Sequence, residues 1–113
     1  MRLQYSELES GIRLIKLRGA LDFYGVGDVE VEFVQRCAGE NVCMLVDLSK
    51  VNYISSIGIP LLINSARSIA RHGGKMALFK PQKSVEEVLE MAGIPLIIPI
   101  YHDSEAAQAA LLP

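Results

Sequence analysis

The sequence predicts an α/β fold, with a mixed, mostly parallel sheet covered by helices. Segments with a strand-like pattern alternate with segments of helical periodicity, in the order two strands, helix, strand, helix, strand, helix, strand, helix. Strands separated by helices pair in parallel through crossover connections. In addition, residues 42–48 form a nearly unbroken apolar run, which is typical of a strand covered on both faces. The length of 113 residues fits one domain, and we expect residues 1–113 to form it.

The N-terminal third of the chain should contain a hairpin and a helix. Residues 12–18 alternate apolar and charged side chains, which predicts a strand with one face toward the core. Residues 4–8 are expected to pair with that strand across a short turn, and residues 19–22 to leave the sheet. Helical spacing over residues 25–37 predicts the first helix. Its two early glycines should delay its start and place Asp28 near its positive end.

The central strand is expected to end at Asp47, which we interpret as a turn-forming residue at the start of a turn over residues 49–52. A pair of serines follows. An amphipathic pattern then predicts a helix that begins near Ile57 or Gly58 and ends near Arg71, where two glycines stop it.

The C-terminal third should hold two strands and two helices. Residues 75–79 are expected to form a buried strand. The spacing of Ser84 and Glu87 predicts a capping box at the start of a short helix. Residues 97–100 should form a short strand, and their proline either places it at an edge of the sheet or excludes its last residues from the strand. The last helix should end near Leu112, with one of two residues as its cap: Asp103 or Ser104.

Charge and hydropathy argue against two classes of partner. The net charge is −2, and no stripe of lysine and arginine is visible, so we expect no direct contact with nucleic acid. The apolar stretch over residues 57–63 is far too short to span a membrane. The first ten residues lack the apolar centre of a signal peptide, so we expect a cytoplasmic protein.

No set of residues in the sequence is typical of catalysis or metal binding. Cys37 and Cys43 are separated by five residues with no histidine nearby, so we expect reduced thiols packed as small apolar side chains. His72 and His102 read as loop residues. There is no glycine-rich phosphate loop and no nucleophile elbow, and the serine pair has no histidine at a plausible spacing. We therefore expect no catalytic residue, no cofactor and no metal, and thus not an enzyme.

The serine pair, Ser55 and Ser56, allows two interpretations. A serine hydroxyl at the start of a helix accepts a hydrogen bond from an unpaired amide, so one serine could simply cap the helix. A helix N-terminus also carries partial positive charge and free amides, which suit a phosphate group. A single cap accounts for only one of the two hydroxyls, and spacing alone leaves both interpretations open.

Two segments resemble a known family. Residues 45–59, LVDLSKVNYISSIGI, are similar to the signature of STAS domains, and more narrowly of bacterial anti-sigma factor antagonists. In that signature a strand ending Asp-Leu-Ser precedes a helix that opens with Ser-x-Gly. Residues 19–22, Gly-Ala-Leu-Asp, resemble the Gly-x-Leu-Asp of the same family. The resemblance covers nearly the whole chain.

The resemblance implies a switch controlled by phosphorylation. It implies that Ser56 is the phosphate acceptor, with Ser55 as the alternative, and that a cognate anti-sigma factor, itself a serine kinase, supplies phosphate from ATP. It further implies that the unphosphorylated protein binds the anti-sigma factor and so releases a sigma factor. A PP2C-type phosphatase would then reverse the modification.

The partner surface implied by this resemblance surrounds the serine pair. The loop that holds Asp22 should lie beside the pair, and aromatic and apolar side chains should supply contact area. The residues expected to bind the partner are Asp22, Phe23, Tyr53, Ser55, Ser56, Gly58 and Ile59. For Ile59, core packing is the alternative, and Asp22 could instead be a turn-forming residue.

A second class of function is compatible with the same resemblance. The chain could be an accessory or ligand-sensing STAS subunit of a transporter or signalling complex. Such a subunit would use its helix surface for permanent docking, without turnover of phosphate.

Overall fold

The computed structural model describes residues 1–113 and contains one five-stranded sheet with the strand order β1-β2-β3-β4-β5. The strands are β1 (Arg2–Glu7), β2 (Arg13–Leu21), β3 (Cys43–Ile54), β4 (Lys75–Phe79) and β5 (Ile100–Tyr101). β1 pairs with β2 in antiparallel fashion, whereas the other neighbours pair in parallel. The expected mixed, mostly parallel sheet and the N-terminal hairpin are confirmed.

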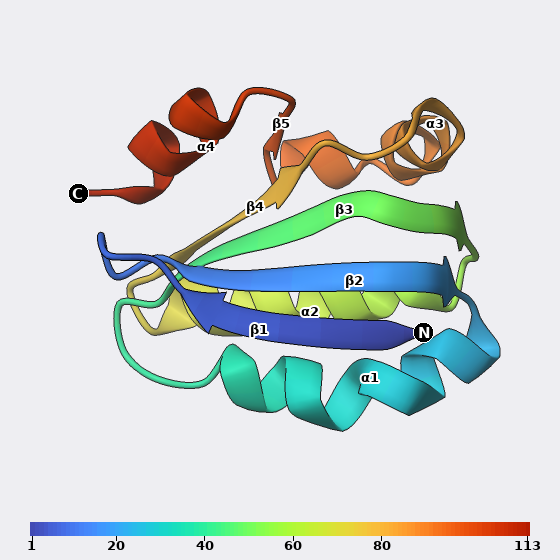
Figure 1. Cartoon of the computed structure of the whole chain (residues 1–113), viewed down its shortest axis with the longest axis horizontal. Helices are drawn as coiled ribbons and strands as arrows, with labels where there is room; N and C mark the ends of the chain where they lie inside the picture. The colour runs from blue at the N-terminus through green and yellow to red at the C-terminus, as the bar shows by residue number, and fades with distance from the viewer.

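Four α-helices cover the sheet: α1 (Phe23–Arg36), α2 (Gly58–Arg71), α3 (Lys83–Met91) and α4 (Ser104–Leu111). A short 3-10 helix, η1 (Ile94–Leu96), lies between α3 and β5. α1 runs beside β1 and β2, and α3 and α4 lie toward the β4 and β5 side of the sheet (Figure 1). The expected order of elements and the bounds of α2 and β4 are confirmed. None of the helices is long and apolar enough to cross a membrane.

The core has two parts, one on each face of the sheet. The larger part packs alternate residues of β2, β3 and β4 against α1, α2 and α3, with Phe33 and Leu62 completely buried in it. The smaller part packs the opposite face against α4, through Ala107 and Leu111. α4 contacts β3, β4 and β5. The face of β1 and β2 that points away from α1 therefore keeps exposed side chains such as Gln4 and Lys16.

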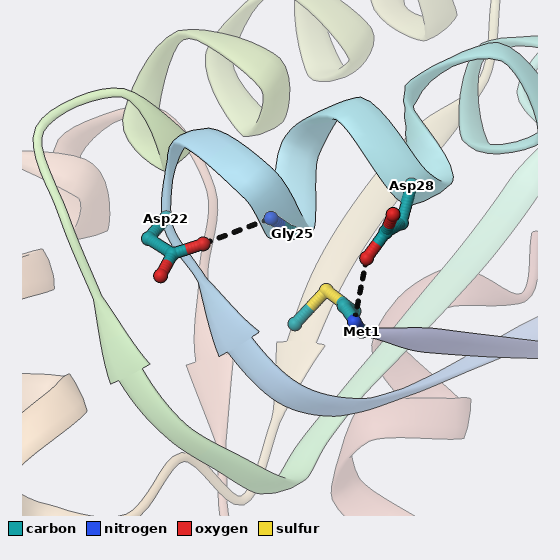
Figure 2. A network of polar contacts seen from close by, with 4 residues as sticks. All are labelled: Met1, Asp22, Gly25 and Asp28. Carbon is teal, nitrogen blue, oxygen red and sulfur yellow. Dashed lines mark hydrogen bonds and ion pairs between the residues drawn. The ribbon is translucent and has the colours of Figure 1, made fainter.

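The start of α1 differs from the prediction. β2 continues through Leu21 instead of ending before residue 19, and α1 begins at Phe23 instead of later. The Asp22 side chain is the reason, because its Oδ1 accepts a hydrogen bond from the Gly25 amide at 2.8 Å (Figure 2). Gly25 does not delay the helix. A Cβ there would collide with the Ala20 carbonyl oxygen, so the glycine lets the helix pack against β2.

Asp28 therefore lies within α1 rather than at its N-terminus, so its predicted position was wrong. Its Oδ2 accepts from the Met1 amino group at 2.8 Å, an ion pair that joins α1 to the start of β1 (Figure 2).

The predicted turn over residues 49–52 was also wrong, because β3 continues to Ile54. Its second half pairs in parallel with β2, with Val51 opposite Gly19 and Ile54 opposite Leu21. The register shifts between Lys16 and Arg18, which is a β-bulge. Asp47 lies inside the strand at this bulge, where its Oδ1 accepts from the Ser49 amide at 2.8 Å. A local bond typical of a turn thus occurs within an extended strand.

Two predictions in the C-terminal third were wrong. α3 begins at Lys83 with Gln82 at its N-cap position, so Ser84 lies inside the helix and forms no capping box. Gln82 donates its side-chain amide to the Ser49 carbonyl at 3.1 Å, which holds the helix entrance against β3. The last strand is Ile100–Tyr101, immediately after the proline, instead of 97–100. The cap of α4 is Asp103, one of the two predicted residues, since its Oδ2 accepts from the Ala106 amide at 2.9 Å.

Candidate functional site

The serine pair lies in a short turn, residues 55–57, between β3 and α2. The Ser55 amide donates to the Leu21 carbonyl at 3.1 Å, and the Ser55 carbonyl accepts from the Gly58 amide at 3.0 Å. The Ser55 hydroxyl accepts from the Ile57 amide at 3.3 Å. Ser55 is half-buried, and all its polar groups take part in forming the turn.

Ser56 has different surroundings. It is exposed, and its hydroxyl makes no hydrogen bond with the rest of the chain. Ile57 occupies the N-cap position of α2 and supplies no capping side chain. Neither serine therefore caps α2 in the usual manner, and a cap does not explain why residue 56 is a serine.

The backbone around Ser56 leaves donors unused. The amides of Ser56 and Ile59 donate to no group of the chain, and Pro60 has no amide hydrogen. These groups lie at the N-terminal end of a 14-residue helix, where the dipole favours negative charge. The turn can therefore accommodate an anionic group on residue 56.

Gly58 joins the turn to the end of β2. A Cβ at this glycine would lie 2.8 Å from both the carbonyl oxygen and the Cγ of Leu21. The absence of a side chain thus allows α2 to begin directly against the residue that precedes Asp22. The structure brings the Asp22 loop and the serine turn together, but Gly58 itself is buried and offers no side chain to a partner.

Large apolar side chains are exposed at the start of α1 and in the serine turn. Phe23 is 68% exposed, Tyr24 78% and Ile57 44%. The two aromatic rings pack edge to face, 5.5 Å between their centroids. Together with Val26 they line an open hollow of about 530 Å³ between α1 and the turn. We name Phe23, Tyr24 and Ile57 the turn patch.

Tyr53 is exposed at the end of β3, next to the turn, and Ile59 is half-buried. A second hollow of about 370 Å³ lies on the other side of Ser56, between Ile59 and Pro60 of α2 and Met91 of α3. Met91 is 82% exposed. Tyr24, Ile57 and Met91 are not among the residues that the sequence predicts to bind a partner. Tyr24 could have been found, because it is on the face of the first helix opposite the apolar Val29 and Phe33; the position of Met91 depends on how α3 packs beside α2.

The remaining reactive side chains lie elsewhere. Burial raises the pKa of the Cys37 thiol from its ordinary 9.0 to about 11, although the nearby Ser65 hydroxyl and the charge of Arg13 act in the opposite direction. His72 Nδ1 lies 2.8 Å from the Ser68 carbonyl, and His102 Nε2 pairs with Glu86 Oε1 at 2.9 Å. No three histidine, cysteine or acidic side chains form a group that could hold a metal ion.

The arrangement of a five-stranded sheet, four helices and an exposed serine before α2 agrees with one family. The family model described as STAS domain matches residues 6–107. The chain belongs to the STAS domain family. This STAS domain is accordingly a regulatory binding module and not an enzyme.

Three curated or solved relatives of this STAS domain each cover at least 96% of the chain. It is 28% identical over 115 residues to the anti-sigma F factor antagonist of Paenibacillus polymyxa, with 98% of this chain and 97% of the relative covered. An anti-sigma factor antagonist from Mycobacterium paratuberculosis superposes with a TM-score of 0.86 at 15% identity, covering 97% of this chain and 92% of that one. The phosphorylated form of SpoIIAA, a Bacillus cell fate determinant, superposes with a TM-score of 0.68 at 18% identity, covering 96% and 99%. At these identities the two solved structures show the fold alone.

Proposed function

We propose that residues 1–113 form a single STAS domain that acts as an anti-sigma factor antagonist and is switched off by phosphorylation of Ser56. The observation that carries this proposal is the state of Ser56, which is exposed, makes no hydrogen bond through its hydroxyl and lies at the N-terminus of α2. The names of the curated relatives support the antagonist role.

The turn should accept a phosphate without unfolding. A phosphoserine adds about −1.5 to −2 charges at neutral pH. The unused amides of Ser56 and Ile59 and the dipole of α2 would stabilise that charge. Because Ser56 contacts solvent, the phosphate displaces no core side chain.

The same phosphate would disrupt binding. The turn patch and Met91 present apolar area on both sides of Ser56, and an apolar partner surface placed over them would have to bury a doubly negative group. We assign the partner surface to Asp22, Phe23, Tyr53, Ser55, Ser56 and Ile59, and extend it to Tyr24, Ile57 and Met91. Gly58 contributes by its packing against Leu21 rather than by contact.

The proposal includes two further proteins. An anti-sigma factor with serine kinase activity would bind the unphosphorylated antagonist and phosphorylate it with ATP, and a PP2C-type phosphatase would restore the hydroxyl. This cycle requires the cytoplasm, where ATP and sigma factors are present.

Ser56 is preferred over Ser55 as acceptor for a geometric reason. The Ser55 hydroxyl already accepts a hydrogen bond from the Ile57 amide, and Ser55 is half-buried. A kinase would have to break this contact to phosphorylate Ser55, whereas Ser56 is accessible as it stands.

Incubation with ATP and the candidate anti-sigma kinase, followed by intact mass measurement, tests the assignment. One phosphate should be added to the native protein and to Ser55→Ala, and none to Ser56→Ala. Ser56→Asp should bind the kinase more weakly, while its melting temperature stays within a few degrees of the native value. Addition of phosphate to Ser56→Ala would refute the assignment of Ser56 as the phosphate acceptor. A failure of every candidate kinase to bind, with stable copurification of a transporter ATPase, would favour the accessory-subunit function.

A further inference from the structure

A third hollow differs in chemical character from the two beside the serine turn. It has a volume of about 550 Å³ and lies over the uncovered face of β1, β2 and β3. Its side chains are mostly hydrogen-bond donors, and it contains no aromatic ring. The charged and amide side chains in it are Arg2, Gln4, Lys16, Arg18, Asp47 and Lys50. We name it the basic hollow.

Strand register places like charges directly beside one another in the basic hollow. Arg2 is opposite Arg18 in the antiparallel β1–β2 pair, and Arg18 is opposite Lys50 in the parallel β2–β3 pair. Like charges at directly opposite positions destabilise a sheet.

None of the four cations forms an ion pair within the chain, although Asp47 lies opposite Lys16 in the β2–β3 pair. The three ion pairs of the structure involve Met1, Arg36 and His102, and none involves a cation of the basic hollow. Asp47 is the only acid in the hollow, and one of its oxygens accepts from the Ser49 amide. Four positive groups and one negative group give the hollow a formal charge of +3, although the whole chain carries −2.

The hollow coincides with the β-bulge between β2 and β3. The register shifts between Lys16, opposite Asp47, and Arg18, opposite Lys50, so β3 has an extra residue there. A bulge bends its strand and redirects side chains. As a result, both Ser49 and Lys50 line the hollow, although they are consecutive in a strand.

We propose that the basic hollow is a binding site for a compact anion that carries two or more phosphate groups. Two arginines and two lysines around a concave surface suit several phosphate oxygens, because guanidinium groups bind them in a bidentate manner and ammonium groups supply point charge. Gln4 and Ser49 add neutral donors. Leu3 and Leu17 also line the hollow, but Leu17 is buried and Leu3 packs against the core, so neither offers an acidic protein segment an exposed apolar anchor. This inference does not depend on the role of Ser56.

Calorimetric titration of the full chain with tripolyphosphate tests the site. The native protein should bind, and Lys16→Gln/Arg18→Gln should bind at least about tenfold more weakly, because it loses two charged donors. The matched control is Arg67→Gln/Arg71→Gln, which removes two exposed cations of α2 and should bind like the native protein. Tripolyphosphate should also raise the melting temperature of the native protein and of the control, but not of Lys16→Gln/Arg18→Gln.

Four results would overturn the proposal. The first is the absence of binding at about 100 mM salt, where weak unspecific attraction is screened. The second is an equal loss of affinity in the α2 control, and the third is binding of an oligoglutamate peptide but not of tripolyphosphate. The fourth is a preference for ATP over tripolyphosphate of more than about tenfold, which would require a base platform that the hollow lacks. Because the readout needs no anti-sigma factor, failure here would leave the proposed function of Ser56 unaffected, and the reverse also holds.

Discussion

Ser55 and Ser56 are neighbours in the chain, yet their side chains have different physical roles. The Ser55 hydroxyl is part of the turn through its bond with the Ile57 amide, whereas the Ser56 hydroxyl has no partner. Gly58 and Gly27 show a similar contrast between a tightly packed position and one with open space around it. Gly58 packs tightly against Leu21, while a Cβ at Gly27 of α1 would meet no atom within 4 Å.

The different packing of Gly27 and Gly58 predicts that a change from glycine to alanine has opposite effects on stability at the two positions. Alanine is intrinsically better than glycine inside a helix by about 1 kcal/mol. Gly27→Ala should therefore raise the free energy of unfolding by about 0.5–1 kcal/mol. Gly58→Ala should lower it by about 1–3 kcal/mol, because the added methyl group overlaps Leu21. Urea denaturation measures both, and a gain in stability for Gly58→Ala would contradict the packing of the serine turn against β2.

At the scale of elements, α1 and α4 begin in the same manner. Asp22 and Asp103 each accept a hydrogen bond from the amide three residues later, at 2.8 and 2.9 Å. The two caps differ in location, since Asp22 precedes the turn patch and Asp103 lies at the start of the C-terminal helix. Asp22 thus has both a structural role and, under the proposed function, a role in partner binding.

The two roles of Asp22 can be separated by measurement. Asp22→Ala and Asp103→Ala should each lower the free energy of unfolding by about 1 kcal/mol, because each leaves a first-turn amide without its acceptor. Asp22→Asn should keep most of this stability, since asparagine caps as well as aspartate. If the carboxylate itself contacts the partner, Asp22→Asn should still weaken binding to the anti-sigma factor. If Asp22→Asn binds the anti-sigma factor as strongly as the native protein does, Asp22 acts only as the cap of α1.

At the scale of the whole molecule, the buried Cys37 thiol links folding to pH. Its pKa in the folded chain is raised to about 11 by burial, so the unfolded chain loses this proton first as the pH rises. Its contribution to stability is complete below the unfolded pKa of 9.0 and decreases as the pH rises from there toward 11.

When the pH is raised from about 8 to about 10, the free energy of unfolding should accordingly decrease by about 1 kcal/mol more for the native protein than for Cys37→Ala. Denaturant titrations of both proteins under reducing conditions give the difference, in which the ionisation of tyrosines and lysines cancels. Equal losses in the two proteins would show that the thiol ionises as readily in the folded chain as in the unfolded one.

Much of the architecture could be predicted from local patterns. Alternating strand and helix periodicities predicted the order of elements, and the Ser-x-Gly motif with the Gly-x-Leu-Asp motif predicted the STAS family, which the family match shows. The errors occurred at boundaries. The segment expected to form a turn, residues 49–52, belongs to β3, because pairing with β2 and burial of Val51 compensate for the low strand preference of its polar residues.

The α/β class, the family and the position of the serine pair before a helix follow from the amino-acid sequence alone, because these depend on periodicity and on residues close together in the chain. The folded chain was needed to show which serine hydroxyl is free, that Gly25 and Gly58 are packing positions, and that one hollow is shared by Arg2, Lys16, Arg18 and Lys50. These features arise where strands distant in sequence come into register, and the register follows from the burial of the whole sheet rather than from any single segment.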